Sequence, residues 1–360
     1  MKKKFPLWKN DGKPAVQFEN LNRDNVDNLI EAIKRKDLIL VENKCLCNNE
    51  HEDIDIVIAE KDRFGLPIPQ VLCSKCGLIR SKFVFDEKSN DLFYEKYYRG
   101  IYTTDMPSDK FFQDQVNTGI WILNLLKQYL DVTDISNVVE IGCGAGGILL
   151  PFLESSKSVS GYDFDEKYLE YGRSKGINLY YGDFYKQTDN NKYDLIILNH
   201  VLEHLLSPLE EIGKLLPKLR IGKYLYIQVP GIYCISDIYK NPLTYFQNAH
   251  VYNFFEQYFR VFFTKFGLKV IYGDERCTFI CQKVSEEIPD VKFIYDESLS
   301  MYPQKNAEYL LECKKRYDIE LKLEKRNRFE RKLRNIACYL GWDKTKKCIK
   351  KIKDRIKWIK

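Results

Sequence analysis

The chain has 360 residues, of which 44% are hydrophobic and 30% are charged, and its formal net charge is +6. This composition can bury a large core and excludes wholesale disorder and a fibrous repeat. The first ten residues include three consecutive lysines but no apolar run of signal-peptide length. No apolar run in the chain approaches the ~20 residues that span a bilayer. We therefore expect a soluble, cytoplasmic protein.

Three segments are expected before the main domain. Residues 1–40 form a polar lead-in with one amphipathic helix at 22–36, because apolar residues recur on one face there. Residues 41–82 contain two closely spaced pairs of cysteines. Residues 83–131 form an aromatic-rich linker that leads into a helix at 110–129. The N-terminal third therefore consists of small additions to a larger domain.

The two cysteine pairs are Cys45-x-Cys47 and Cys73-x-x-Cys76. The total of eleven cysteines is odd and no secretory signal precedes them, which favours free thiols or metal ligands over disulfides. Four thiolates in two such pairs are typical of a structural zinc site. The first pair is tighter than usual, so His51 is an alternative ligand in place of one thiol.

Residues 132–284 alternate short apolar runs with amphipathic helices, which predicts an α/β domain with a parallel sheet. From 285 to 360 the chain becomes polar and then basic, and a helical tail is expected there. Four helices are expected in the α/β domain, at 146–154, 166–174, 208–219 and 253–266. Seven strands are expected, at 138–141, 159–162, 178–180, 194–198, 224–229, 269–272 and 278–282.

A glycine-rich turn follows the first expected strand, where residues 138–147 read VVEIGCGAGG. Glycines let the backbone approach a ligand closely, and the helix that follows offers free N–H donors. The spacing also fits a dinucleotide fingerprint, but Glu140 would then face a pyrophosphate with like charge. A carboxylate at this place instead suits a ligand with a cationic amine and no phosphate, such as S-adenosyl-L-methionine.

The segment 136–284 resembles the class I S-adenosylmethionine-dependent methyltransferases, whose first motif is an acid followed by Gly-x-Gly-x-Gly. The resemblance implies a Rossmann-like seven-stranded sheet with the cofactor beyond the carboxyl ends of its strands. It implies that Asp163 binds the ribose hydroxyls, that Asp183 faces the exocyclic amine of adenine and that Phe184 lies beside the ring. The residues assigned to the cofactor are Glu140, Gly142, Cys143, Gly144, Gly146, Asp163, Asp183, Phe184 and Asn199.

Three of the four histidines follow the fourth expected strand. The sequence from His200 to His204 fits the His-x-x-Glu-His zinc motif of inverted metallopeptidases, but that interpretation leaves the glycine turn unexplained. Methyltransferases carry Leu-Glu-His at this place, and the resemblance implies that these residues border the methyl-transfer site. We expect His204, Glu203 and His250 to be catalytic, with an imidazole accepting a proton from the acceptor. The alternative is that they only hold the loop or pack beside it.

The cysteine-containing module gives a second resemblance. The segment 62–80 and the tyrosines up to Tyr102 are similar to the N-terminal zinc-binding module of bacterial sugar- and polysaccharide-modifying methyltransferases. This resemblance implies a structural zinc, and tyrosines that either close over the acceptor or pack two domains together. Sugar carbon-methyltransferases with this module carry a sizeable C-terminal domain, whereas this chain ends in basic helix. Oxygen or nitrogen methylation is therefore expected rather than carbon methylation.

The end of the chain is expected to form a basic amphipathic helix, with isoleucines at 349, 352, 356 and 359 among lysines. Such a helix is typical of peripheral contact with the inner face of a membrane. Packing on its own domain or on a dimer partner is the alternative, which leaves the oligomeric state open. Nucleic acid is not expected as a partner, because no RNA-binding module accompanies the charge.

These features together predict transfer of a methyl group from S-adenosyl-L-methionine to a small molecule or a surface-glycan precursor. Two alternatives stay open. The first is a methyltransferase that acts on RNA or protein, and the second is a scaffold that binds the cofactor without turnover.

Overall fold

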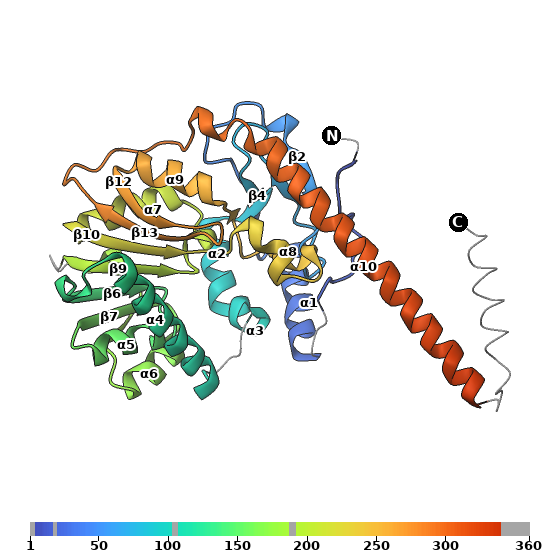
Figure 1. Ribbon diagram of the computed structural model, residues 1–360, viewed down its shortest axis with the longest axis horizontal. Helices are drawn as coiled ribbons and strands as arrows, with labels where there is room; N and C mark the ends of the chain where they lie inside the picture. The colour runs from blue at the N-terminus through green and yellow to red at the C-terminus, as the bar shows by residue number, and fades with distance from the viewer. Residues whose placement is uncertain (1–3, 17–19, 103–106, 187–191, 340–360) are drawn as a thin grey trace. The chain divides into compact units, whose positions relative to one another are not determined.

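The computed structural model of the protein describes residues 4–16, 20–102, 107–186 and 192–339 (Figure 1). The chain divides into two compact units, Met1–Leu310 and Leu311–Lys360. The basic helix expected around residues 349–359 lies outside the described residues and stays a prediction. Within the described ranges, no helix combines the length and the apolar character that crossing a membrane requires.

A seven-stranded sheet forms the body of the first unit. Each strand is a short apolar run that can be buried on both faces, and every residue of the central strand except the last is buried. All strand pairs are parallel except those of β13, which runs antiparallel to both of its neighbours. The seven strands confirm the seven expected from the sequence. Their spatial order is β8 (Leu179–Tyr181), β7 (Ser158–Asp163), β6 (Asn137–Ile141), β9 (Tyr193–Asn199), β10 (Leu219–Gln228), β13 (Thr278–Lys283) and β12 (Leu268–Gly273).

Helices cover both faces of this sheet (Figure 1). Ser108 caps the first of them, because its side chain accepts a hydrogen bond from the N–H of Phe111. The helix expected at 253–266 begins only at Glu256, since residues 252 and 253 form a strand. On one face lie α4 (Asp109–Tyr129), α5 (Leu150–Glu154) and α6 (Glu166–Ser174), and on the other lie α7 (Pro208–Leu215) and α9 (Glu256–Lys265).

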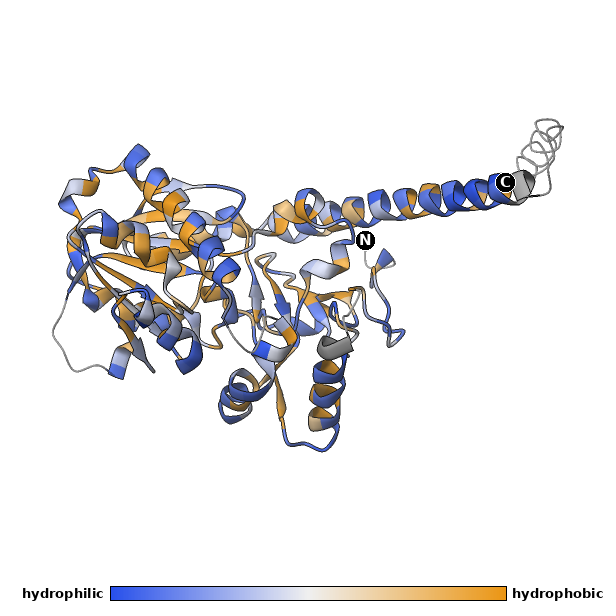
Figure 2. Ribbon diagram, turned by 90° about the horizontal axis from the view of Figure 1, so that it is seen from below, coloured by the Kyte–Doolittle hydropathy of each residue, from blue (hydrophilic) through white to orange (hydrophobic). Residues whose placement is uncertain are grey.

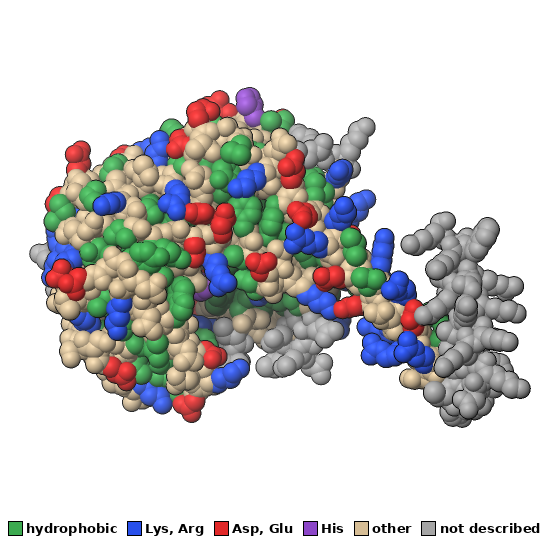
Figure 3. Space-filling view, in the orientation of Figure 1, with side chains coloured by type: hydrophobic (Ala, Val, Ile, Leu, Met, Phe, Trp, Pro, Cys, Tyr) green, Lys and Arg blue, Asp and Glu red, His purple; other side chains and the backbone are tan. Residues whose placement is uncertain are grey.

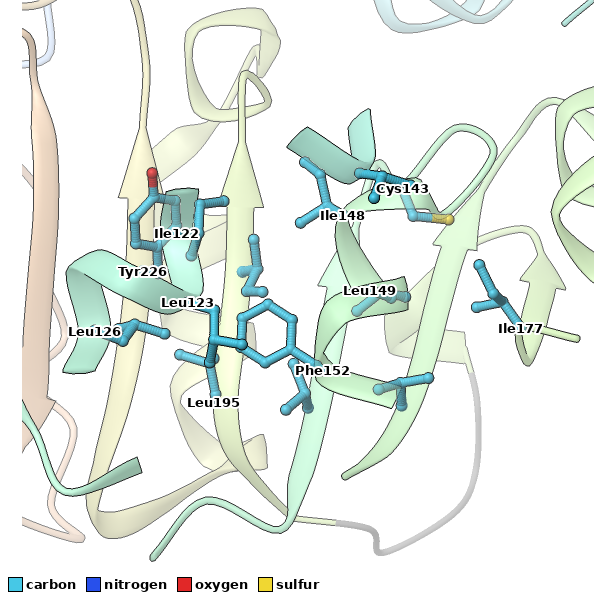
Figure 4. Close-up of a cluster of buried hydrophobic side chains, with 14 of the residues drawn as sticks. Ile122, Leu123, Leu126, Cys143, Ile148, Leu149, Phe152, Ile177, Leu195 and Tyr226 are labelled. Atoms are coloured by element: carbon cyan, nitrogen blue, oxygen red, sulfur yellow. The ribbon is translucent and has the colours of Figure 1, made fainter. Parts of the chain in front are cut away.

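The main core lies between the sheet and α4, α5 and α6. Ile122 and Leu126 from α4 meet Leu149 and Phe152 above β9, and all four are buried (Figure 4). Figure 2 shows that the strands inside the unit are mostly hydrophobic and that hydrophilic residues lie on the outer faces of the helices. Helix α4 approaches the chain after the glycine turn closely because Gly119 has no side chain. A Cβ on Gly119 would lie 2.3 Å from the carbonyl oxygen of Ile148.

The cysteine-containing module is built around a second, four-stranded sheet. Its order is β11 (Tyr252–Asn253), β4 (Ile79–Ser81), β3 (Gln70–Leu72) and β2 (Ile56–Ala59), all antiparallel. Strand β11 comes from a segment far along the chain, between the strands of the seven-stranded sheet. The module is therefore completed by residues that the sequence assigns to the α/β domain.

The remaining N-terminal elements surround this small sheet. A two-stranded sheet pairs β1 (Leu40–Glu42) with β5 (Phe83–Phe85). The expected first helix is present as α1 (Asn20–Lys34). The aromatic linker is helical throughout its first part, as α2 (Glu87–Phe93), a π-helical turn (Tyr94–Tyr98) and α3 (Arg99–Tyr102).

The short helix α8 (Ile235–Ile238) follows β10. After β13 the chain forms no further α-helix or strand up to the start of α10 (Tyr302–Tyr339). The first turns of α10 pack on the cysteine module, where the side-chain amide of Asn306 donates to the carbonyl of Gly77 at 2.9 Å. A Cβ on Gly77 would lie 2.7 Å from the backbone of Tyr302, so only glycine fits there. Figure 3 shows acidic and basic side chains interspersed over the face of the first unit in view.

Two glycine substitutions in helices are expected to have opposite effects. Gly119→Ala should lower the free energy of unfolding by about 1–3 kcal/mol, because its methyl group collides with the backbone of Ile148. Gly213→Ala should raise it by up to about 1 kcal/mol, since nothing lies within 4 Å of the added Cβ and alanine favours a helix. Urea unfolding followed by circular dichroism measures both, and effects of the same sign would contradict this account of the packing.

Candidate active site and cysteine cluster

The turn after β6 contains three glycines in the left-handed conformation. Gly142, Gly144 and Gly146 have φ of 71°, 56° and 73°, which residues with side chains adopt only under strain. The N–H groups of Gly142 and Cys143 both donate to the carbonyl of Tyr162, at 2.8 and 3.1 Å. These bonds fix the turn to β7 and leave its outer edge at the carboxyl ends of the strands, where ligands of such sheets bind.

Helix α4 supports the turn from the other side through Gln115. Its side-chain amide donates to the carbonyl of Cys143 at 3.0 Å and accepts from the N–H of Gly147 at 3.2 Å. No sequence motif indicated this residue, because it is one polar position in an amphipathic helix. Only the close approach of α4 to the turn places it there.

Two acceptor atoms at the carboxyl edge of the sheet lack hydrogen-bond partners. Glu140, near the end of β6, is 1% exposed, and its Oε2 atom has no partner. Burial and the charge of Asp163 raise the pKa of Glu140 well above its usual range. Asn199, at the end of the neighbouring strand β9, has a buried Oδ1 atom with no partner. Unsatisfied buried acceptors suit a ligand that brings N–H donors, which is the kind of ligand predicted from the sequence.

Asp163, at the end of β7, faces the glycine turn. Its Oδ2 atom accepts from the N–H of Gly144 at 2.8 Å, and its Oδ1 atom accepts from the N–H of Asp165 at 2.9 Å. Burial raises the pKa of Asp163. Arg99 of α3 lies 3.6 Å from Oδ1 and pairs with Asp165 at 2.9 Å, so the aromatic linker reaches this carboxylate. No sequence motif indicated Arg99.

The expected adenine-binding corner lies after β8. Asp183 accepts a hydrogen bond from the N–H of Tyr185 at 2.8 Å, which fixes its carboxylate in a tight turn. Phe184 is buried, and its ring contacts those of Tyr162, Tyr185 and Tyr193. The structure thus places Asp183 in a turn and Phe184 in a packed aromatic group.

The three expected catalytic side chains form one cluster, in which two imidazoles lie beside the buried carboxylate of Glu203. The Oε1 atom of Glu203 lies 3.9 Å from Nε2 of His204 and 4.0 Å from Nε2 of His250, and the two imidazole rings are 4.9 Å apart. His204 Nδ1 lies 3.0 Å from the carbonyl oxygen of Ala249. Burial lowers the pKa of both imidazoles, and more strongly that of His250. The donor atoms of this cluster all lie within 4.8 Å of one another, so it could also hold a metal ion.

The segment from His200 to His204 does not form the metallopeptidase arrangement. That motif requires two histidines on one face of an α-helix, whereas here a single 3-10 turn covers Leu202–His204 and His200 has a left-handed φ of 56°. His200 instead points its Nδ1 atom to Glu203 at 3.3 Å, with half of its side chain exposed. The carboxylate of Glu203 therefore has three imidazoles around it.

The tyrosines of the linker form one wall of this cluster. Tyr94 and Tyr98 place ring edges against His204, with centroid distances of 6.4 and 6.0 Å. Tyr98 stacks on Tyr102 at 5.0 Å, and burial raises the pKa of Tyr98 to about 12. A shallow depression lies beside Tyr94 and Ala249. Both expectations for these aromatics, packing between segments and covering the site, are compatible with this position.

The four expected cysteines form a compact buried cluster. Sγ–Sγ distances are 3.6 Å from Cys45 to Cys76, 3.4 Å from Cys47 to Cys45 and 3.5 Å from Cys47 to Cys73. Four sulfurs around one tetrahedral ion at 2.3 Å would lie about 3.8 Å apart, close to these values. The backbone N–H groups of Lys75 and Leu78 point to sulfur atoms, as they do around metal-bound thiolates. The side chain of His51 is exposed and is not part of the cluster.

Residues 112–272 match a family model described as a methyltransferase domain. This match and the order of the seven strands confirm that the segment is a methyltransferase domain, as the sequence predicts. No curated protein matches the chain.

Many solved structures resemble part of the chain at low identity. An amino pentose methyltransferase from Micromonospora echinaspora involved in calicheamicin biosynthesis is 18% identical, over 38% of this chain and 55% of that one, with a TM-score of 0.29. A SAM-dependent methyltransferase from Archaeoglobus fulgidus is 18% identical, over 44% and 73%, with a TM-score of 0.37. A structure of the Haloferax volcanii Trm112 methyltransferase activator in complex with a putative methyltransferase also matches. It is 17% identical, over 46% of this chain and 76% of that one, with a TM-score of 0.37. The chain spans about half the length of the first such structures.

Replacing the buried carboxyl of Glu140 is expected to stabilise the ligand-free protein. Because the pKa of Glu140 is raised, folding favours its neutral form, and the wild type loses stability as the pH rises from 4.5 toward the raised pKa. The Glu140→Gln variant does not titrate, so at pH 7 its free energy of unfolding should exceed that of the wild type by about 1 kcal/mol or more. The difference should vanish well below pH 4.5.

Urea unfolding at a series of pH values tests this expectation. Glu154→Gln, at an exposed position in α5, is the matched control and should follow the wild type. A Glu140→Gln variant that is less stable than the wild type at pH 7 would show that the carboxylate is satisfied in the free protein.

Proposed function

We propose that the protein transfers a methyl group from S-adenosyl-L-methionine to a small-molecule or glycan-related acceptor. The observation that carries this proposal is the pair of carboxylates, buried Glu140 and partly buried Asp163, on either side of a turn of three left-handed glycines. Glu140 and Asn199 would receive the cationic amine of the cofactor, and Asp163 its ribose hydroxyls. Asp183 and Phe184 would hold the adenine beside β8.

The reaction then depends on positioning. The cofactor supplies a methyl group already activated by a sulfonium, so alignment of the acceptor carries much of the rate. His204 is suited to receive the proton that the acceptor loses. The carbonyl of Ala249 can only accept, so the contact to Nδ1 places the ring proton there and leaves Nε2 with a free lone pair. Glu203 and His250 lie beside that lone pair and would stabilise the protonated ring.

One feature supports a glycan-related acceptor. The module before the sheet contributes the tyrosines beside His204, as expected from its likeness to the modules of sugar-modifying enzymes.

We also propose that the cysteine cluster holds one structural zinc ion. Its donor set is four sulfurs, which would fill a tetrahedral site and leave no position for a reactant. A metal there would connect Cys45 and Cys47 with the knuckle of Cys73 and Cys76, and α10 begins on that knuckle. The ion would therefore stabilise the module and take no part in the transfer.

Loss of one carboxylate should abolish most of the cofactor affinity. We expect Asp163→Ala to weaken binding of S-adenosyl-L-methionine by about 10- to 100-fold, because charge-assisted hydrogen bonds to the ribose are worth roughly 1.5–3 kcal/mol each. Calorimetric titration measures the effect, with Asp91→Ala at an exposed position of α2 as the control. Wild-type protein that is folded and zinc-loaded but binds no cofactor would contradict the proposed function.

Metal analysis tests the assignment of the cysteine cluster. We expect one zinc per chain, lost in Cys73→Ser and retained in Cys234→Ser, whose sulfur lies outside the cluster. Chelation should lower the melting temperature of the wild type, because structural zinc contributes directly to folding. Zinc that persists in Cys73→Ser but disappears in His204→Gln would instead place the metal at the histidines.

A further inference from the structure

Arg63 is a cation that the cysteine module places beside the candidate active site. It lies in the loop between β2 and β3, where its N–H donates to the carbonyl of Phe246 and its own carbonyl accepts from Ala15, both at 2.8 Å. Its guanidinium lies 4.7 Å from the ring centre of Phe64 and 5.0 Å from that of Tyr102. The side chain is thus fixed at its base, and its guanidinium lies against two aromatic rings that pack edge to face, 5.3 Å apart.

The guanidinium has no counter-ion among the residues that the structure describes. No carboxylate oxygen lies within ion-pair distance of it there, and its Nε atom is buried without a hydrogen-bond partner. The neighbouring carboxylate of Asp62 is occupied elsewhere. One of its oxygens accepts from the N–H groups of Phe64 and Leu66, and the other accepts from the N–H of Asn248.

A second unsatisfied donor lies near the same ring. The hydroxyl of Tyr102 donates a hydrogen bond to Oδ1 of Asn248. The amide nitrogen of Asn248 is buried and has no hydrogen-bond partner. Asn248 also lines the depression beside Tyr94 and Ala249. Tyr102 stacks on Tyr98, whose ring contacts His204, so Arg63 and Asn248 lie on the side where the histidines meet.

Two buried donors, Nε of Arg63 and the amide nitrogen of Asn248, have no acceptor among the residues that the structure describes. Leaving buried donors unpaired is costly, and an arginine shielded by aromatic rings binds an oxyanion more strongly than one in water. Planar guanidinium groups pair with carboxylate or phosphate through two parallel hydrogen bonds. We propose that Arg63 and Asn248 bind an anionic oxyanion group of the acceptor, a carboxylate or a phosphate. This inference rests on the proposed function and narrows its acceptor to an anionic molecule.

Binding of simple anions to the full chain tests the proposal without knowledge of the acceptor. In the presence of saturating S-adenosylhomocysteine, ligand-observed NMR would measure the affinity for pyrophosphate, for D-glucuronate and for neutral D-glucose. We expect one of the two anions to bind at least tenfold more tightly than glucose. A preference for pyrophosphate would identify a phosphorylated acceptor, and a preference for glucuronate a carboxylated one.

Three variants assign that binding to Arg63. Arg63→Gln should weaken anion binding at least tenfold. Arg63→Lys should give an intermediate loss, because lysine keeps the positive charge but lacks the two parallel N–H donors of the guanidinium. Arg23→Gln, at an exposed position of α1, is the control and should have no effect. All variants should bind S-adenosylhomocysteine like the wild type, which also shows that they are folded.

The inference would be overturned by anion affinities that are equal in Arg63→Gln and the wild type. It would also be overturned by a wild type that prefers neither anion to glucose. In both cases unchanged binding of S-adenosylhomocysteine would leave the proposed function intact. A wild type that binds no S-adenosylhomocysteine would overturn the proposed function, and this inference with it.

Discussion

The pairing of β11 with β4 decides how the candidate active site is assembled. Only two residues of β11 take part, with Tyr252 opposite Arg80 and Asn253 opposite Ile79. The residue before them, Val251, donates to the carbonyl of Glu203 at 2.8 Å and accepts from Ser81 at 3.1 Å. One short stretch of backbone therefore holds the loop after β9 on one side and the cysteine module on the other. Without it, His250 would have no fixed position near Glu203.

Buried ionisable groups concentrate at this junction and at the glycine turn. Glu140 and Glu203 are each 1% exposed and each has an oxygen with no partner, and His250 is also buried. Such groups cost stability in the free protein, and they are the places where a sequence sacrifices stability for function. By contrast, the core under α4 is apolar and closely packed, and it supplies the rigid support that positions these groups.

The sequence alone predicted the elements whose signal is local. All seven strands of the large sheet were predicted because each contains a short apolar stretch. The glycine turn was predicted because three glycines within five residues directly after such a stretch favour a tight left-handed turn. The cysteine cluster was predicted from its spacing, although whether His51 belonged to it was open until its exposed position was known. The roles of Glu203, His204 and His250 remain predictions that their proximity supports.

What the sequence could not indicate depends on contacts between distant segments. The sequence predicts a helix that begins at residue 253, whereas residues 252 and 253 form a strand. Nothing local in the sequence shows that a strand of another module pairs with them. Gln115 belongs to no motif, and Arg63 has no role of its own in the resemblance of the segment 62–80. Each lies at a position that only the packing of α4 or of the cysteine module creates. Side chains brought together by folding also decide which acceptor fits, so that part of the function requires the structure.

The central claim is that the glycine turn and the histidine cluster form one methyl-transfer site. A crystal structure with S-adenosylhomocysteine tests it most directly. The account predicts that the amine of the ligand lies at Glu140, that its ribose lies at Asp163 and that its sulfur faces the side where His204 and His250 meet. A ligand bound elsewhere, or one whose sulfur faces away from these histidines, would contradict it.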